Sequence, residues 1–179
     1  VGGKQLGLQL GEAEDFKSYD ELFDAYKKQI EHFADIKVKG SNMITRIYAK
    51  YMPAPFLSII TDDCITNGKD YNAGGARYNT NYLQGVGIGT ITDSLSAIKY
   101  NVYDKKNFTM GELMKALQDN FEGEEHVRLY NLVSRKTPKY GNDDDYADAI
   151  MKEVFTFYKN TITGRPNMRN GQWRINMLP

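Results

Sequence analysis

Six glycines lie within the 22 residues from Gly68 to Gly89, of only 16 in the whole chain of 179 residues. This stretch reads GKDYNAGGARYNTNYLQGVGIGT and continues into an amphipathic segment, ITDSLSAIKYNVY, that ends at Tyr103. Glycine adopts positive φ without strain and lets two backbone segments approach closely, so this density predicts demanding local backbone. We expect the rest of the chain to pack around residues 68–103.

Helical patterns surround the glycine-rich stretch. Ser18 and Glu21 form a capping box, which predicts a helix from Tyr19 whose apolar face reaches Ile36. Gly40 is expected to kink or end this helix, after which a second helical stripe runs to the prolines at 53 and 55. Further helices are expected over 56–65 (short and buried), after Thr92 or Asp93, from the Thr109–Glu112 capping box to near Gly123, over 126–135, and after Asp143–Asp145.

Strand signals are few. Alternating leucines predict a short strand or an extended segment within residues 1–17, and the apolar run from Trp173 to Leu178 predicts a strand. The expected fold is mainly helical with two or three short strands.

Composition excludes several classes of protein. Lys and Arg number 23, as do Asp and Glu, so no net charge recruits nucleic acid or an anionic membrane. No apolar run approaches the ~18 residues of a membrane span. A single cysteine, Cys64, excludes an internal disulfide and a cysteine-rich metal site within this chain, and a reducing, cytoplasmic setting is expected.

Candidate chemical groups do not assemble into a site. Gly85, Gly87 and Gly89 give GxGxG, which lacks both the GxGxxG spacing of a dinucleotide fingerprint and the GK[ST] of a phosphate loop, so tight packing is favoured. Cys64 fits a small core residue better than a nucleophile. His32 and His126 are too isolated to indicate a metal site. The acidic run is either a calcium site or a helix cap and comprises Asp143, Asp144 and Asp145. A nucleic-acid surface or a solvated loop could be formed by Arg165, Arg169, Arg174 and Trp173. No catalytic, cofactor-binding or metal-binding residue is predicted.

Three stretches in order carry a resemblance to a known family. DDCITNGKDYNAGGARYN, QGVGIGTITDSLSAIKY and TPKYGNDDDYAD resemble the glycyl radical enzymes of the pyruvate formate-lyase type, over nearly the whole chain. DSLSAIKY (93–100) and YGNDD (140–144) look family-wide, whereas GGARYN looks like the dehydratase and lyase branch. YNAGGARYNTNYLQGVGIGT and RPNMRNGQWRINMLP are most similar to members of that branch that remove water from trans-4-hydroxy-L-proline.

The resemblance implies a fold and a mechanism. The fold would be a ten-stranded β/α barrel around two loops, one with a cysteine and one with a glycine. An activating enzyme that uses S-adenosylmethionine and an iron–sulfur cluster would make a glycyl radical, which in turn makes a thiyl radical that abstracts hydrogen from the substrate. A glutamate acts as the base for loss of water. The family also implies a homodimer.

The chain departs from the family at the reacting residues. The thiyl cysteine belongs in GCxE, whereas Cys64 lies in DDCITNG, and no glycine here has the RVxGY neighbours of the radical glycine. We therefore expect residues 1–179 to be one internal segment of the larger barrel domain, without either loop. As scaffold it would be inactive alone and need the remainder of the enzyme. The resemblance implies that the glycine-rich stretch supplies a barrel strand, so Gly87→Val in the intact enzyme is expected to overpack that strand and lower both folded yield and activity. The alternatives are another glycyl radical lyase or dehydratase, acting on glycerol, propanediol or choline, and a non-catalytic helical ligand-binding module.

Overall fold

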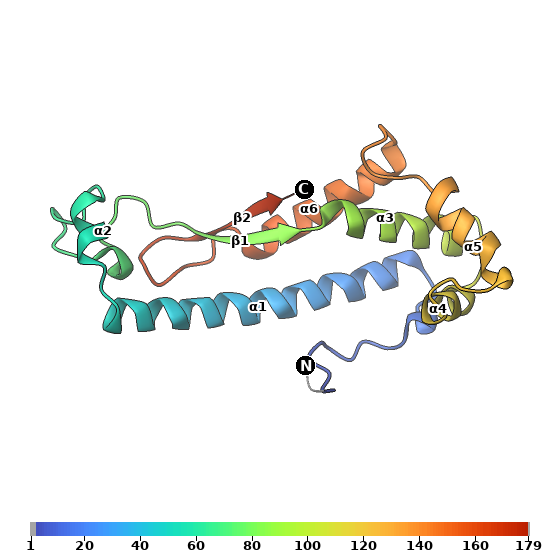
Figure 1. Cartoon of the computed structure of the whole chain (residues 1–179), viewed down its shortest axis with the longest axis horizontal. Helices are drawn as coiled ribbons and strands as arrows, with labels where there is room; N and C mark the ends of the chain where they lie inside the picture. The colour runs from blue at the N-terminus through green and yellow to red at the C-terminus, as the bar shows by residue number, and fades with distance from the viewer. Residues whose placement is uncertain (1–2, 179) are drawn as a thin grey trace. The chain divides into compact units, whose positions relative to one another are not determined.

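A computed structural model describes residues 3–178 of the chain, and this part is mainly helical (Figure 1). The α-helices are α1 (Tyr19–Tyr51), α2 (Pro55–Ile60), α3 (Ile88–Ile98), α4 (Met110–Gln118), α5 (Val127–Asn131) and α6 (Asp145–Ile162). Strands β1 (Asn81–Val86) and β2 (Trp173–Leu178) pair in a two-stranded sheet. Single 3₁₀ turns lie at Ala13–Asp15, Tyr71–Ala73 and Glu124–His126, and π-helical turns follow α3 at Lys99–Asp104 and α5 at Leu132–Lys136.

The expectation of a mainly helical chain with two short strands is thus confirmed for the described residues, and the ten-stranded barrel is not formed by them. They divide into two compact units. Unit 1 holds residues 3–29 and 86–157, and unit 2 holds residues 30–85 and 158–178. Among the helices of residues 3–178, none is long and apolar enough to cross a membrane.

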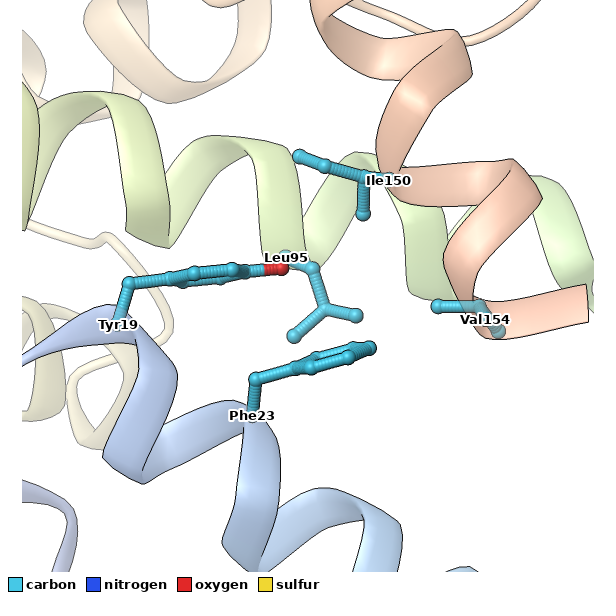
Figure 2. Close-up of a cluster of buried hydrophobic side chains, with 5 residues drawn as sticks. All are labelled: Tyr19, Phe23, Leu95, Ile150 and Val154. Carbon is cyan, nitrogen blue, oxygen red and sulfur yellow. The ribbon is translucent and has the colours of Figure 1, made fainter. Parts of the chain in front are cut away.

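Unit 1 is built on two apolar clusters. Tyr19 and Phe23 of α1 pack against Leu95 of α3 and against Ile150 and Val154 of α6 (Figure 2). The second cluster joins α4 to α5 and comprises Phe108, Met110, Leu113, Ala116 and Leu129. Within each helix these buried positions recur at the spacing of one helix face, as expected for helices that pack on a core.

Unit 2 has a smaller core. Ala34 and Val38 of α1 pack with Ile162 of α6 and Trp173 of β2, all less than a tenth exposed. Residues along β1 alternate between half-buried and exposed, the period of a strand with one covered face. The strand predicted over Trp173–Leu178 is confirmed with the same bounds.

Helix caps follow the predicted chemistry. The backbone N–H of Glu21 donates to Ser18 Oγ at 3.2 Å, although the Glu21 carboxylate accepts from the N–H of Lys17, one residue before the one expected. Thr109 and Glu112 form the full reciprocal box that begins α4. Asp144 Oδ1 accepts the N–H of Tyr146 at 3.0 Å, so the acidic run does cap α6.

Several expectations about helices were wrong. α1 continues through Gly40 without a break, because one glycine costs a helix only about 1 kcal/mol relative to alanine. α3 begins at Ile88, and Thr92 lies inside it, fully buried, instead of capping it. Gly87 is the residue before α3, with φ of +83°, so Gly87→Val would strain the backbone and not overpack a strand.

Other differences concern bounds and exposure. α2 ends at Ile60 and is not buried, since Phe56 is 85% exposed and Ile60 79%. α4 ends at Gln118, several residues before Gly123. The segment from residue 3 to Glu12 is extended and contains no strand, and residues 1 and 2 lie outside the described residues.

Candidate functional site

The two stretches that singled out the dehydratase branch meet in unit 2. The side chain of Asn167 donates to the carbonyl oxygen of Asn79 and to Asn81 Oδ1, and its own Oδ1 accepts the N–H groups of Arg169 and Gly171 at 3.0 and 2.9 Å. Both donors and both lone pairs of this amide are therefore used. We call Tyr71, Asn79, Asn81, Asn167 and Arg169 the asparagine knot.

Arg169 gives the knot its only charge. Its Nη2 donates to Asn81 Oδ1 at 2.9 Å, and its guanidinium carbon lies 5.4 Å from the centre of the Tyr71 ring. Arg169 Nε and Asn79 Oδ1 are shielded from solvent and have no hydrogen-bond partner among the described residues. One cation, three amides and a phenol provide no nucleophile and no base for neutral pH, so this arrangement holds chain segments together and does not perform acid–base chemistry.

Three glycines allow the backbone segments around the asparagine knot to approach one another closely. A Cβ on Gly74 would lie 2.6 Å from the carbonyl oxygen of Arg169, and a Cβ on Gly75 would overlap that of Lys69. A Cβ on Gly171 would overlap the carbonyl oxygen of Asn79. The neighbouring atoms are all backbone, which cannot move aside as the end of a side chain can. The predicted close backbone approach is confirmed at Gly74 and Gly75, and Gly171 shows the same feature outside the glycine-rich stretch.

Hydrogen bonds of Asp70 link the glycine-rich stretch to α2. Its Oδ2 accepts the N–H of Ala54 and the hydroxyl of Ser58, both at 2.8 Å, and its Oδ1 accepts the N–H of Asn72. Partial burial of Asp70 opposes ionisation, but hydrogen bonds from Ser58, Asn72 and Ala54 outweigh it and lower the pKa of this carboxyl. Asp70 is thus an ionised anchor at the start of the glycine-rich stretch.

The two family-wide stretches meet in unit 1. Asp93 Oδ1 accepts the N–H of Tyr140 at 2.9 Å, and Ser96 Oγ donates to the carbonyl oxygen of Pro138 at 2.7 Å. Asn101, in the π-helical turn and 1% exposed, donates to Thr137 Oγ1 at 2.8 Å. Segments about 40 residues apart are therefore joined by hydrogen bonds in which side chains take part.

A surface groove of about 840 Å³ lies beside this π-helical turn. Its walls include Tyr19, Lys99, Tyr103 and Asp104. The Lys99 ammonium lies over the rings of Tyr19 and Tyr146, 5.3 and 4.9 Å from their centres. Burial and then the hydrogen bond to Asp104 raise the pKa of the Tyr146 phenol, which therefore stays neutral. The residues that line the groove include no cysteine or histidine, and their ionisable side chains are lysines, carboxylates and tyrosines.

The candidates considered from the sequence do not come together. Cys64 is 2% exposed, and burial followed by the charges of Asp70 and Asp63 raises the pKa of its thiol, which disfavours the reactive thiolate. His126 is buried in unit 1, with Nε2 2.9 Å from Asp119 Oδ2. His32 lies on α1 with its ring 5.3 Å from that of Phe33. The described residues contain no group of three acidic, histidine or cysteine side chains arranged for a metal ion.

Arg165, Arg169 and Trp173, near the end of the chain, make contacts within unit 2, whereas Arg174 is exposed. Arg165 forms an ion pair with Asp35 at 2.6 Å, and Trp173 is buried with its indole N–H donating to Asn42 Oδ1 at 3.1 Å. With Arg169 in the knot, these side chains do not form a nucleic-acid surface. Asn79, Asn81 and Asn167 were not among the candidate residues from the sequence, although all three lie in the stretches that carry the family resemblance.

Comparison with known proteins extends this picture. The family model described as pyruvate formate lyase-like matches residues 1–179. Trans-4-hydroxy-L-proline dehydratase of Clostridioides difficile is 60% identical over all 179 residues, which span 22% of that relative. A crystal structure of hydroxyproline dehydratase from C. difficile, with trans-4-hydroxy-L-proline bound, matches with a TM-score of 0.94, at 60% identity over 100% of this chain and 22% of that one. The glycerol-bound, B12-independent glycerol dehydratase of Clostridium butyricum matches with a TM-score of 0.87, at 36% identity over 96% of this chain and 22% of that one.

Proposed function

The chain belongs to the pyruvate formate lyase-like family, and on that basis we propose that it is an internal segment of a glycyl radical dehydratase that removes water from trans-4-hydroxy-L-proline. One observation carries the choice of substrate, namely the 60% identity that extends over the whole chain to a hydroxyproline dehydratase. The chain spans about a fifth of the length of the relatives it matches, so the activity is that of the longer polypeptide.

Within that enzyme we assign the segment a scaffold role. The asparagine knot and the Asp93–Ser96 contacts use hydrogen bonds to fix chain segments that are distant in sequence. Precise placement of the surrounding chain is what a cavity that protects radicals from water requires. The segment's own residues hold and orient structure, and no residue of it is assigned a role in the reaction.

The radical cofactor does not fit this segment. Cys64 has no glutamate two residues later, its thiol is buried, and no glycine has the RVxGY neighbours of a radical glycine. We therefore place the glycyl radical on parts of the enzyme beyond this chain, and we propose that a separate activating enzyme, which uses S-adenosylmethionine and an iron–sulfur cluster, installs it there. A homodimer and a cytoplasmic location are further parts of the proposal, and they follow from the family.

A second candidate is a dehydratase for another alcohol. Glycerol and propanediol are supported equally as alternatives, because a glycerol dehydratase and an enzyme of 1,2-propanediol dehydration each match at 36% identity with a TM-score of 0.87, and choline is a further substrate of this enzyme class. Because the identity to those proteins is 36% against 60% for the hydroxyproline enzyme, hydroxyproline is preferred.

An assay of the longer enzyme separates these candidates. The intact polypeptide, activated anaerobically by its activating enzyme, would be given trans-4-hydroxy-L-proline, glycerol, propanediol and choline in parallel, with unactivated enzyme as the control. We expect consumption of hydroxyproline alone, with a pyrroline carboxylate as product. Turnover of glycerol without turnover of hydroxyproline would overturn the substrate, and failure to form a glycyl radical would favour the non-catalytic binding module.

A further inference from the structure

The unit 2 part of α1 has two apolar faces. Ala34 and Val38 point into the core of unit 2 and are 5% and 4% exposed. A second apolar row is exposed and comprises Phe33, Ile36, Met43, Ile44, Ile47 and Tyr51, which we call the outer stripe. With about 3.6 residues in each helical turn, the outer stripe lies on the side of α1 opposite Ala34 and Val38. A helix that is apolar on opposite sides is typical of one buried between two layers.

The outer stripe is too continuous for scattered surface residues. Its side chains are between 44% and 67% exposed, and they follow one line over about five turns of helix. Contiguous exposed apolar surface of this kind marks an interaction site. Cations flank it, with Lys37 on one side and Lys39, Arg46 and Lys50 on the other.

Gly40 lies at the centre of the outer stripe, four residues after Ile36 and four before Ile44. Glycine is poorly suited to the interior of a helix. Gly40 does not have the positive φ that would favour glycine, and no described atom lies within 4 Å of the position its Cβ would occupy. Neither the backbone nor the packing of residues 3–178 therefore requires glycine here. A glycine on a helix face lets another helix approach closely, because the distance between packed helices depends on the side chains at the crossing point.

We propose that the outer stripe is the contact surface for another helix of the same, longer polypeptide, which crosses α1 at Gly40 and carries carboxylates beside its apolar face. The inference rests on the proposed function, since the matched relatives have more than three quarters of their length outside the region that this chain covers. An α-helix is the preferred occupant because it satisfies its own backbone hydrogen bonds and presents a matching apolar row.

Oxidation of Met43 measures whether the stripe is covered. Met43 is 66% exposed in this chain and reacts with peroxide to give a sulfoxide that mass spectrometry detects. In the folded longer enzyme we expect Met43 to be oxidised roughly tenfold or more slowly than in the same enzyme unfolded in urea, since burial keeps oxidant from the sulfur. Equal rates would overturn the proposal. Protection that disappears when the longer enzyme is diluted to its monomer would also overturn it, because the occupant would then be a second copy.

Substitutions of Gly40 test the close approach. In the longer enzyme, Gly40→Ala should lower the unfolding temperature despite alanine's better helix propensity, and Gly40→Leu should lower it further. The matched controls, Glu31→Ala and Glu31→Leu at an exposed position of the same helix outside the outer stripe and its flanking cations, should leave it nearly unchanged. A higher unfolding temperature for Gly40→Ala is the behaviour of a solvent-exposed helix and would contradict a close crossing.

Failure of this inference and failure of the proposed substrate give different results. An enzyme that dehydrates hydroxyproline while Met43 oxidises freely would retain the proposed function and lose the helix contact. An enzyme inactive on hydroxyproline in which Met43 is protected and Gly40→Ala is destabilising would retain the contact and lose the substrate.

Discussion

Gly171 shows how single residues set the structure of unit 2. Its backbone lies so close to the carbonyl of Asn79 that a side chain cannot be placed there, and its N–H is held by Asn167 Oδ1. Gly75 is in the same position relative to the carbonyl of Lys69. These contacts involve backbone on both sides, so neither partner can relieve an overlap by changing a rotamer.

We predict that Gly171→Ala destabilises the chain by about 2–4 kcal/mol, because the overlap must be relieved by a backbone shift that also disturbs the hydrogen bonds of Asn167. Urea unfolding followed by circular dichroism gives the difference. Gly89→Ala is the control, since its Cβ would be 3.5 Å from Tyr140 Cδ1, an ordinary contact. If the two variants unfolded at the same urea concentration, the close approach at Gly171 would be refuted.

Single residues show which features could be predicted from the sequence and which could not. Glycine density predicted close backbone approach, and this is correct at Gly74 and Gly75. The partners could not be predicted, because Asn79 and Asn167 are 88 residues apart and nothing local pairs them. Cys64 was correctly predicted to be a buried core residue, since a lone thiol in an apolar segment has few other uses.

At the scale of elements, Asp70 links a helix to a loop. It holds the N–H of Ala54, at the start of α2, and the hydroxyl of Ser58, within α2. It also caps the 3₁₀ turn at Tyr71–Ala73 through the N–H of Asn72. α2 buries little of its own apolar surface in this chain, so its position depends on these polar contacts.

The lowered pKa of Asp70 makes this link depend on pH. A carboxyl whose pKa is lower in the folded state stabilises that state above its unfolded pKa, near 4, and the stabilisation is lost as the pH falls through the folded value. The free energy of unfolding should therefore fall between about pH 5 and pH 2, and Asp70→Asn should reduce that fall. Urea titrations at several pH values measure the slope. If Asp70→Asn left the pH dependence of the free energy of unfolding unchanged, ionisation of Asp70 would not contribute to the stability of the folded state.

Local sequence signals predicted where helices begin better than they predicted tertiary packing and burial. The capping chemistry at Ser18, Thr109 and Asp144 located three helix starts correctly, because it depends on neighbouring residues alone. The continuation of α1 through Gly40 could not be predicted, since tertiary packing of Ala34 and Val38 outweighs the low propensity of one glycine. The burial expected for α2 was wrong for this chain, where Phe56 and Ile60 are exposed.

On the scale of the whole molecule, the exposed apolar surface and the family membership are both explained if the chain is a segment of a longer enzyme. The outer stripe of α1 and the apolar residues of α2 are exposed in a chain that spans about a fifth of its relatives. Among the described residues, the stretches that resemble the family contribute hydrogen bonds and close backbone contacts. These contacts support the proposed scaffold role.

Replacing Cys64 tests this central claim most directly. The claim is that the segment supports a hydroxyproline-dehydrating radical enzyme without supplying its thiyl cysteine. Cys64→Ala in the anaerobically activated, full-length enzyme should turn over trans-4-hydroxy-L-proline within about twofold of the parent rate, because a buried cysteine acts mainly as a small apolar side chain. Circular dichroism would verify that the variant is folded. A folded Cys64→Ala enzyme that carries the glycyl radical but has lost all turnover, beside an active parent, would contradict the account.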